Sequence, residues 1–361
     1  MNDFKIGLID ADLIGRKNHR FPNLALMKLS TYAGGGDLIL DYDNISKYDK
    51  VYVSKVFTDT PFPKEILNYN NIEYGGTGFY FDKAPNLPYE AEHSMPDYHL
   101  YDEWLQDKPD TTAYKEYRDY SIGFTTRGCF RKCKFCVNQK YDCAVKHSPL
   151  EEFLDKDRKK ICLLDDNILS YKHWRDIWEQ LINADKPFKF KQGLDERLLT
   201  DEKCSVIFSC RYDGPYTFAF DNPEDYDLIK QKLELIRKYT TSTNITFYVL
   251  CGYKGTDIND ILNIFKRVEL LMNYGCVPYI MRYQSPTETP YMNSEYREAY
   301  IAIARWCNQP SHFKKSTFEE FCELNQSYIK TEGYICSAMR GLNSIRGKIP
   351  EKYLTMRWRY I

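Results

Sequence analysis

The sequence predicts an α/β fold, and three observations support this prediction. Strand-like runs rich in β-branched and aromatic residues alternate with amphipathic helical segments along most of the 361 residues. This alternation occurs six times within residues 119–285, which favours parallel strands that curve into a partial barrel of six strand–helix units. A shorter alternation occupies residues 1–78, and residues 286–361 have a mostly helical pattern.

Residues 1–78 are expected to form a small parallel α/β domain. Its strands are predicted at 4–10, 37–40, 50–54 and 72–74, with helices at 23–32 and 64–69. Three glycines at 34–36 end the first helix. The run Gly75-Gly76-Thr77-Gly78 follows the last strand, where such sheets bind ligands, although a tight turn is the simpler explanation.

Residues 79–118 contain several prolines and many tyrosines but little periodicity, so we expect an extended linker to the barrel. A segment of this length without regular structure is uncommon, so it should pack on the barrel or line its mouth. Its residues Tyr98, Tyr101, His93 and His99 could reach a substrate, but ordinary packing is the expected role.

The barrel strands are predicted at 121–125, 160–165, 188–192, 216–221, 245–250 and 277–283. Helices are predicted between them at 171–183, 223–239 and 257–274. In α/β barrels the chemistry lies at the carboxyl ends of the strands. Polar residues follow the predicted strand ends here, so these ends are the expected site.

Residues 286–361 should contain helices at 293–308 and 316–325, the second capped by Ser316-Thr317 with Glu319-Glu320 in its first turn. The end of the chain is basic. It could face a nucleic acid, or it could be a solvated tail anchored by aromatic residues. The cations are Arg340, Arg346, Lys348, Lys352, Arg357 and Arg359, and the aromatic residues are Tyr353, Trp358 and Tyr360.

Composition argues against several classes of protein. A net charge of −1 gives no general attraction to nucleic acid or anionic membrane. The sequence contains no apolar run of about 20 residues and no signal-peptide pattern, so we expect a cytoplasmic protein without a membrane partner. Twelve cysteines in a chain of this kind do not indicate a disulfide scaffold.

Three cysteines, Cys129, Cys133 and Cys136, follow the first barrel strand at the spacing Cys-x3-Cys-x2-Cys. Thiolates are soft ligands that suit iron–sulfur clusters and zinc. A structural zinc site usually needs four ligands, and the sequence has no second Cys-x2-Cys pair. A [4Fe-4S] cluster normally takes four cysteines, so three would leave one iron open to a small molecule. We predict such a cluster, with zinc or three unrelated free cysteines as weaker alternatives.

The other nine cysteines all come after Cys129, so residues 1–128 cannot bind a cluster through cysteine. Most of the nine lie in apolar strand or helix patterns, where a free cysteine behaves as a small hydrophobic residue. Cys307, Cys322 and Cys336 could hold a second cluster, but their wide and irregular spacing is weak evidence.

The cysteine run resembles the signature of the radical S-adenosylmethionine (radical SAM) enzymes, Cys-x3-Cys-x-aromatic-Cys. Phe135 matches the aromatic residue that lies against the adenine. The resemblance implies a partial (β/α)6 TIM-like barrel, open on one side, in which the open iron chelates S-adenosylmethionine. Reductive cleavage then yields a 5′-deoxyadenosyl radical that abstracts hydrogen from a substrate. It also implies a flavodoxin- or ferredoxin-like protein as reductant.

Charge suggests which residues at the strand ends would hold S-adenosylmethionine. Asp165 or Asp166 can pair with its ammonium, and Asn167 can donate a hydrogen bond nearby. Arg197 and Arg282 are candidates for its carboxylate, which suits the bidentate guanidinium.

Three further residues are expected at the cofactor. Gly252 would let the backbone approach the adenine closely. Gln192 and Asp195 lie in a Gln-Gly-Leu-Asp run that also looks like the family's usual sequences, as do Asp165-Asp166-Asn167 and the run at Gly252.

Residues 1–78 loosely resemble the Rossmann-like domain of the cobalamin-binding branch of this family. There a loop Asp-x-His-x-x-Gly follows the first strand, and its histidine ligates cobalt. Here the run is Asp10-Ala11-Asp12-Leu13-Ile14-Gly15, so Asp12 stands at the histidine position. Some members of the branch bind cobalamin without this histidine. Cobalamin binding is therefore not favoured, and we expect a domain that has kept the shape of the cobalamin-binding domain but has lost the cofactor.

The resemblance implies an enzyme that cleaves S-adenosylmethionine reductively and functionalises a C–H bond of an unidentified substrate, such as a nucleobase or a peptide. Methylthiotransferases carry an additional N-terminal set of three cysteines, which this sequence lacks. Two alternatives stay open. One is a cobalamin-dependent methyltransferase, and the other is an iron–sulfur binding or electron-transfer protein that does not cleave S-adenosylmethionine.

Overall fold

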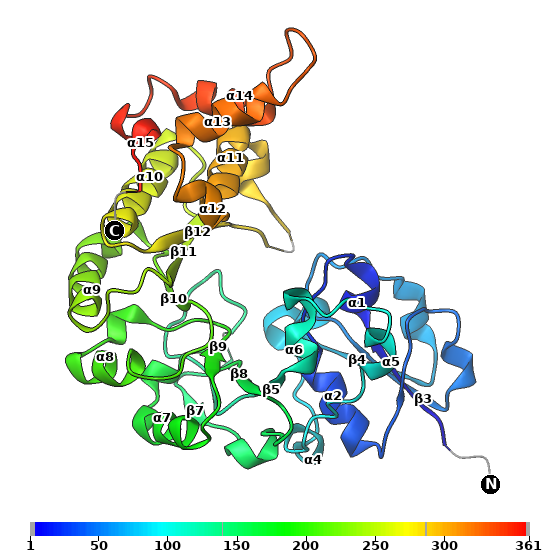
Figure 1. The fold of residues 1–361 in the computed structure, drawn as a ribbon. Coiled ribbons are helices and arrows are strands. Elements are labelled where there is room, and N and C mark those ends of the chain that lie inside the picture. The colour runs from blue at the N-terminus through cyan, green and yellow to red at the C-terminus, as the bar shows by residue number, and fades with distance from the viewer. Residues whose placement is uncertain (1–3, 139, 286, 359–361) are drawn as a thin grey trace. The chain divides into compact units, whose positions relative to one another are not determined.

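The computed structural model describes residues 4–138, 140–285 and 287–358 (Figure 1). The chain divides into two compact units, Met1–Gln192 and Gly193–Ile361. Each unit contains helices and a parallel sheet, which confirms the predicted α/β class. The first unit contains the predicted first domain, the predicted linker and three of the predicted barrel strands.

The first unit begins with a four-stranded parallel sheet in the order β2-β1-β3-β4. Its elements are β1 (Ile6–Asp10), α1 (Ala11–Gly15), α2 (Leu24–Tyr32), β2 (Asp37–Leu38), β3 (Lys50–Ser54) and β4 (Ile72–Gly75). The Asn23 side chain caps α2 by accepting a hydrogen bond from the amide of Leu26. Because side chains alternate along a strand, Leu8 packs in a core on one face of β1 and Ile9 in a second core.

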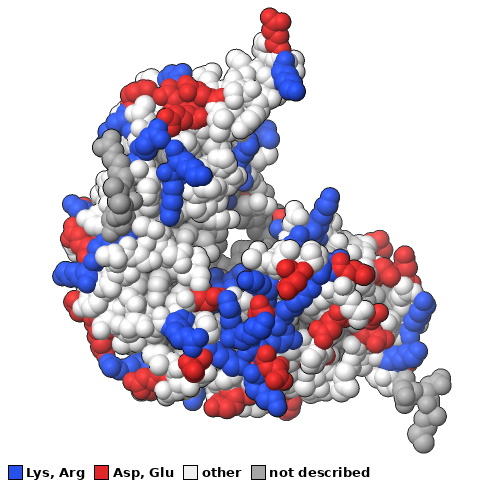
Figure 2. All heavy atoms as spheres, in the orientation of Figure 1, with Lys and Arg blue, Asp and Glu red and all other residues white. Residues whose placement is uncertain are grey.

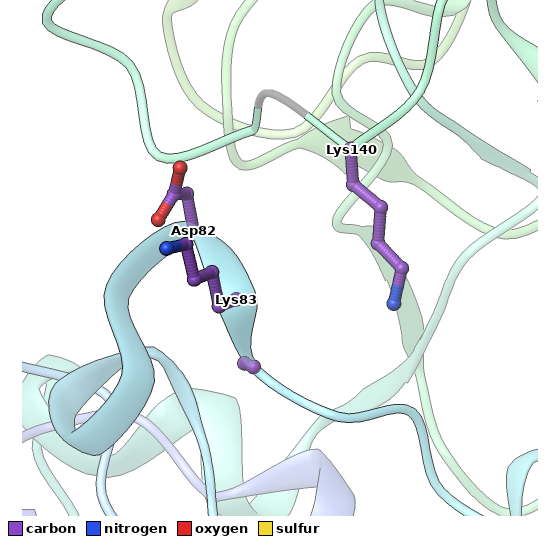
Figure 3. Close-up of a pocket in the computed structure, with 4 residues that line it drawn as sticks. Asp82, Lys83 and Lys140 are labelled. Atoms are coloured by element: carbon purple, nitrogen blue, oxygen red, sulfur yellow. The ribbon is translucent and has the colours of Figure 1, made fainter.

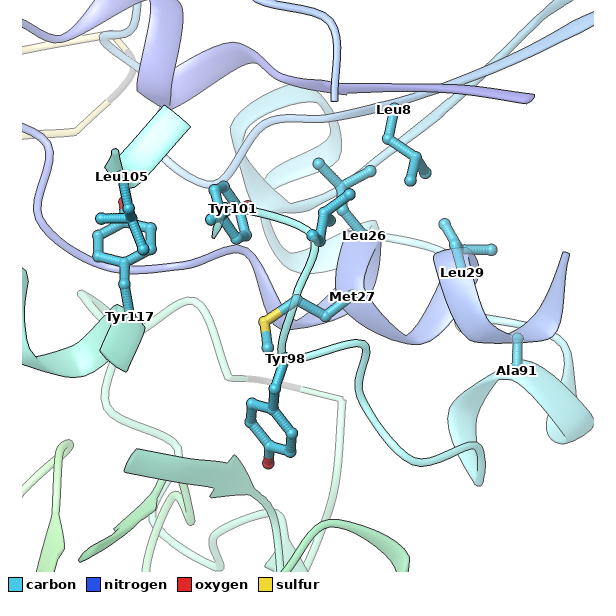
Figure 4. Packing of buried hydrophobic residues seen from close by; sticks show 10 residues of the cluster. Leu8, Leu26, Met27, Leu29, Ala91, Tyr98, Tyr101, Leu105 and Tyr117 are labelled. Atoms are coloured by element: carbon cyan, nitrogen blue, oxygen red, sulfur yellow. The ribbon is translucent and has the colours of Figure 1, made fainter. Parts of the chain in front are cut away.

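Residues 79–118, predicted as an extended linker, instead form several short helices. These are α3 (Thr77–Tyr80), η3 (Phe81–Lys83), α4 (Tyr89–Glu92), α5 (Asp102–Leu105), η4 (Thr112–Tyr114) and α6 (Lys115–Arg118). Tyr98, Tyr101 and Tyr117 are buried in one core with Leu26 and Met27 of α2 (Figure 4). One-turn helices are too short to show a hydrophobic period, so sequence patterns could not detect them.

Tyr98 connects this segment to the second sheet of the first unit. Its hydroxyl donates to the carbonyl of Phe153 (2.6 Å) and accepts from the amide of Ile122 in β5 (2.8 Å). The guanidinium of Arg158 donates to the carbonyls of Tyr98 and Tyr117. The segment therefore packs against the first barrel strand, as expected, but as part of the core.

We predict that Tyr98→Phe lowers the free energy of unfolding by roughly 1–3 kcal/mol, because it leaves a buried amide and a buried carbonyl without their partner. Urea denaturation measures this change. Tyr89→Phe is the matched control, since Tyr89 is 73% exposed, and it should change stability by less than about 0.5 kcal/mol. Equal stability of the two variants would contradict the structural role of the segment.

The second sheet of the first unit is parallel and has the order β5-β8-β9. Its elements are β5 (Tyr120–Gly123), β8 (Lys160–Leu163), α7 (Trp174–Asn183) and β9 (Phe188–Phe190). Helix α7 covers one face, where Trp178 stacks on Phe190 with ring centroids 4.9 Å apart. An antiparallel ribbon of β6 (Thr126–Arg127) and β7 (Val145–Lys146) follows β5, and its two-residue strands are too short to predict.

The second unit contains a parallel sheet in the order β10-β11-β12. Its elements are α8 (Asp201–Ile207), β10 (Tyr216–Ala219), α9 (Tyr226–Tyr239), β11 (Ile245–Cys251), α10 (Ile258–Asn273) and β12 (Val277–Arg282). Among the described residues, the six predicted strands therefore pair as two three-stranded sheets rather than as one. The predicted strands at 160–165 and 188–192 are shorter in the structure.

Helices complete the second unit. They are α11 (Arg297–Cys307), α12 (Pro310–Phe313), α13 (Phe318–Ser327), α14 (Ser337–Ile345) and α15 (Lys352–Thr355). Thr317 and Glu320 form a capping box at the start of α13, close to the predicted cap. Short 3₁₀ turns elsewhere are η1 (Ile45–Lys47), η2 (Lys64–Asn68), η5 (Leu150–Glu152), η6 (Ile168–Ser170), η7 (Glu196–Leu198), η8 (Pro223–Asp225) and η9 (Pro290–Asn293).

The basic residues near the end of the chain form ion pairs within the second unit. Their pairs are Arg340 with Glu298, Arg346 with Glu319, Lys348 with Glu295, Lys352 with Glu269 and Arg357 with Glu320. Tyr353 is buried, and Trp358 packs edge-on against Phe313. These contacts support the anchored tail over the nucleic-acid interface. Arg359 and Tyr360 lie outside the described residues.

None of the helices in the described part of the chain is long and apolar enough to span a lipid bilayer.

Candidate functional site

Cys129, Cys133 and Cys136 lie in the loop of residues 128–144 between β6 and β7, which we call the cysteine loop. All three are partly exposed. Cys129 Sγ accepts hydrogen bonds from the amide of Arg131 (3.4 Å) and from the Asn167 side chain (3.3 Å). Such N–H donors to sulfur tune thiolate ligands in metal centres.

Asp165 holds the chain just before the cysteine loop. Its carboxylate is fully buried and accepts hydrogen bonds from the amides and hydroxyls of Thr125 and Thr126, at 2.6–3.1 Å. Burial raises the pKa of Asp165, although these four hydrogen bonds oppose the increase. Asp165 therefore positions the chain that leads into the cysteine loop.

Asp166 connects the two ends of the cysteine run. One carboxylate oxygen accepts from the amide of Gly128 (2.6 Å), and the other accepts from the Asn138 side chain (2.5 Å). Burial raises the pKa of Asp166, and the Gly128 amide and the charge of Arg127 act in the opposite direction. Asp166 therefore closes the loop around the cysteines, and Asn167 adds the hydrogen bond to Cys129.

Gly128 is required where the loop begins. Its φ is +96°, a conformation that residues with a side chain rarely adopt. A Cβ at this position would lie 2.4 Å from the carbonyl oxygen of Cys143 and 2.5 Å from Cβ of Tyr141. The outgoing and returning arms of the cysteine loop are therefore in contact at this glycine.

The donor set of the loop fits an iron–sulfur cluster by its chemistry: three soft thiols, partly exposed, on a loop anchored at both ends. Among the described residues, no three Cys, His, Asp or Glu side chains are gathered closely enough to hold a metal ion. The sulfur atoms would therefore have to converge when a cluster binds. Phe135 is half-buried within the same loop.

The three cysteines considered for a second cluster are separated in the second unit. Cys307 is buried beside Cys251, whereas Cys322 lies near Cys336. Burial raises the pKa of Cys307 and of Cys322, which keeps both as thiols. They behave as core residues.

The other predicted cofactor residues are distributed over the two units. Gln192 is exposed at the end of the first unit. In the second unit, Arg197 forms an ion pair with Asp195 (2.8 Å) and lies 3.4 Å from a carboxylate oxygen of Asp225. The guanidinium of Arg197 is therefore already bound by these two carboxylates. Asp195 is 7% exposed.

Gly252 and Arg282 follow neighbouring strands of the second unit. Gly252 has a φ of +69°, and its amide donates to Asp260 (2.8 Å). The Arg282 guanidinium lies over the ring of Tyr291, 5.0 Å from its centroid. No ion pair to Arg282 occurs among residues that the structure describes, so this cation suits an anionic ligand better than Arg197 does.

Glu196 is a buried acid for which the sequence suggested no role. One of its carboxylate oxygens accepts from the amide of Ala219 at the end of β10 (3.0 Å). The other has no hydrogen-bond partner among the described residues. Burial raises the pKa of Glu196 to about 8, so it holds a proton at neutral pH. Nothing in the sequence distinguishes it from the charged residues beside it.

Asp12, the residue compared with a cobalt-ligating histidine on sequence resemblance, is fully buried. Its carboxylate accepts hydrogen bonds from the amides of Val56 (2.6 Å) and Phe57 (3.3 Å) and from the hydroxyl of Thr60. A Cβ at Gly15 would lie 2.7 Å from the Thr60 side chain. The segment after β3 therefore covers the end of β1, and Asp12 holds it there.

Asp10 makes the first unit sensitive to pH. Burial raises its pKa from an ordinary 3.8 to about 7, although Tyr101 donates a hydrogen bond to it. Because the folded state binds this proton more tightly, Asp10 contributes stability that is fully present below about pH 4 and is lost as the pH rises through 7.

We expect the free energy of unfolding to fall by up to roughly 4 kcal/mol from this group between pH 4 and pH 8, and Asp10→Asn to reduce that fall. Urea denaturation across this range measures both slopes. Asp43→Asn, on an exposed turn, is the control and should keep the wild-type slope. Identical slopes in the wild type and Asp10→Asn would exclude the raised pKa.

A basic surface covers part of the first unit. Lys and Arg side chains gather over β5, β8 and β9 in Figure 2. Lys189 in β9 and Lys191 just after it share one counter-ion, Glu116, at 3.0 and 3.6 Å. The end of β9 therefore carries a positive excess.

A pocket of about 300 Å³ adjoins the end of the cysteine loop (Figure 3). Asp82, Lys83 and Ala84 line it from the first domain, and Lys140 lines it from the loop. The amino group of Lys140 also donates to the side chain of Asn86 (2.7 Å). The pocket has two cations and one acid, so it suits an anionic group.

The chain matches no family model, and no curated protein shows significant similarity to it. A functional assignment therefore depends on the cysteine loop and on the residues that hold it.

Proposed function

We propose that the protein is a radical SAM enzyme that cleaves S-adenosylmethionine reductively and functionalises a C–H bond of its substrate. One observation carries this proposal. The loop with Cys129, Cys133 and Cys136 comes after the carboxyl end of β5, and Asp166, which follows β8, accepts hydrogen bonds from both ends of the cysteine run. When bound, a [4Fe-4S] cluster would supply the electron and the open iron site. The chain itself carries the three thiols on one loop and donates hydrogen bonds to the sulfur atoms of Cys129 and Cys136.

We infer that the two three-stranded sheets belong to one partial barrel of six strands. The strands of each sheet are parallel and follow chain order. Leu194, just after β9 in the chain, donates to the carbonyl of Thr217 in β10 (2.8 Å).

The proposed cofactor contacts differ from those suggested by the sequence. Asp165, Asp166 and Asn167 form hydrogen bonds to the cysteine loop and to the strand before it, so the open iron of a bound cluster, rather than these side chains, would hold the amino group of S-adenosylmethionine. Arg282, which lacks a carboxylate partner in the described part of the chain, is the preferred residue for the cofactor carboxylate. Phe135 stays the proposed contact for the adenine.

Cobalamin does not fit the first domain well. Asp12 has its oxygens occupied by the segment after β3, and this segment covers the strand ends where the cofactor would bind. We therefore propose a structural role for this domain and no methyl transfer through cobalamin.

An acidic electron donor, such as a flavodoxin- or ferredoxin-like protein, is the proposed reductant. Residues 127–146 contain six Lys or Arg residues and one acid, Asp142. This excess of positive charge next to the cysteines would attract an acidic partner, with a rate that falls as salt increases. The positive excess at the end of β9 favours an anionic substrate such as a nucleic acid over a neutral peptide.

The deciding experiment reconstitutes the cluster under anaerobic conditions, adds a strong reductant and S-adenosylmethionine, and quantifies 5′-deoxyadenosine. We expect product from the wild type and a loss of at least about 100-fold in Cys133→Ala, because two thiolates cannot retain the cluster. Cys210→Ala, at a cysteine outside the loop, should keep full activity.

Two results would change the assignment. A well-formed cluster that yields no 5′-deoxyadenosine, with or without candidate substrates, would favour a cluster-bearing binding or electron-transfer protein. Product that depends on added cobalamin would instead favour the cobalamin-dependent methyltransferase.

A further inference from the structure

A fourth cysteine, Cys143, lies on the returning arm of the cysteine loop. The ribbon pairs Thr126 with Lys146 and Arg127 with Val145. The ribbon ends at Arg127 and Val145, and beyond it the two arms stay in contact at Gly128. A Cβ at Gly128 would lie 2.4 Å from the Cys143 carbonyl oxygen, so the backbone of Cys143 lies against the residue that precedes Cys129.

Cys143 is also the most accessible thiol of the protein. It is the one exposed cysteine among the twelve, all of which the structure describes. Seven others are buried, and burial raises the pKa of Cys204, Cys251 and Cys276 to about 12, which leaves them unreactive at neutral pH. The most accessible cysteine thiol therefore lies in the cysteine loop.

We propose that Cys129 and Cys143 form a disulfide when the loop carries no cluster. A disulfide needs Cα atoms about 4.4–6.8 Å apart, and the contact at Gly128 places the Cys143 backbone against the residue next to Cys129. The new bond joins the two Sγ atoms, and their two electrons and two protons pass to a small disulfide such as oxidised glutathione, which becomes two thiols. The six cations of residues 127–146 attract this anionic oxidant.

The disulfide removes Cys129 from the set of cluster ligands, so a cluster can enter only after the bond is reduced. Cluster loading thereby becomes dependent on the thiol redox state. This consequence rests on the proposed function, whereas the disulfide itself does not.

The sequence allows a direct test, because Lys and Arg residues separate the four cysteines. Trypsin places Cys129 in 128–131, Cys133 in 133–134, Cys136 in 135–140 and Cys143 in 141–146. The full-length apoprotein is equilibrated with reduced and oxidised glutathione, alkylated, digested and examined by mass spectrometry. We expect the cross-linked pair of 128–131 with 141–146 to dominate.

Two variants sharpen the test. Cys143→Ser should abolish this cross-link, whereas Cys210→Ser should leave it unchanged. Without added thiol, Cys143→Ser should also bind iron and sulfide several-fold faster than the wild type, and a reductant should remove the difference.

A dominant Cys133–Cys136 bond, or Cys143 recovered fully alkylated under oxidising conditions, would overturn the proposal. A cross-link in a protein that never loads a cluster would instead count against the proposed function alone.

Discussion

Asp165→Ala is expected to destabilise the first unit by roughly 3–5 kcal/mol and to abolish cluster binding. The substitution leaves the amides and hydroxyls of Thr125 and Thr126 without an acceptor in a fully buried site. Each buried donor without a partner costs about 1–3 kcal/mol, and the two hydroxyls can recover part of this by rotating. Urea denaturation measures the loss of stability, and iron analysis after reconstitution measures the loss of cluster.

Two further variants separate the carboxylate from the shape of the side chain. Asp165→Asn preserves the shape but puts an amide nitrogen against donors, so it should have an intermediate effect. Asp176→Ala, at a surface carboxylate whose side chain is 68% exposed, should change stability by less than about 0.5 kcal/mol. If Asp165→Ala were as mild as Asp176→Ala, the hydrogen bonds at Asp165 would not hold the loop.

Gly128→Ala is expected to reduce the iron bound after reconstitution by about tenfold or more, with little change in global stability. An alanine at a φ of +96° is strained, by about 1–2 kcal/mol. Its Cβ would also press on the Cys143 carbonyl, so the two arms must separate. A strain of 1.4 kcal/mol corresponds to about tenfold in an equilibrium constant. The loop is exposed, so its distortion affects the core only slightly.

Gly255→Ala is the matched control for this prediction. Gly255 does not have a positive φ, and a Cβ there would meet no atom within 4 Å. It should bind iron like the wild type. Normal iron content in Gly128→Ala would mean that cluster binding tolerates a different loop conformation from the one described.

Helices α9 and α10 and the strands β3, β8, β11 and β12 could be predicted because each has a sustained hydrophobic period. The ribbon of β6 and β7 and the helices of residues 79–118 could not, because each spans only about one period of its pattern. The roles of the aromatic residues in that segment depend on tertiary contacts. Tyr98 connects the segment to the second sheet through hydrogen bonds with Phe153 and Ile122, and only the structure shows that these residues lie beside it.

The sequence by itself determined the α/β class, the spacing of Cys129, Cys133 and Cys136, and the polar residues at the strand ends, because period and ligand spacing are local properties. Only the tertiary structure decided what those polar residues do. It showed that Asp165 and Asp166 bind the chain around the cysteines and that Asp12 closes the first domain. It also placed the backbone of Cys143 against Gly128, the residue that precedes Cys129. These roles depend on hydrogen bonds between residues up to 48 positions apart, which no local pattern encodes.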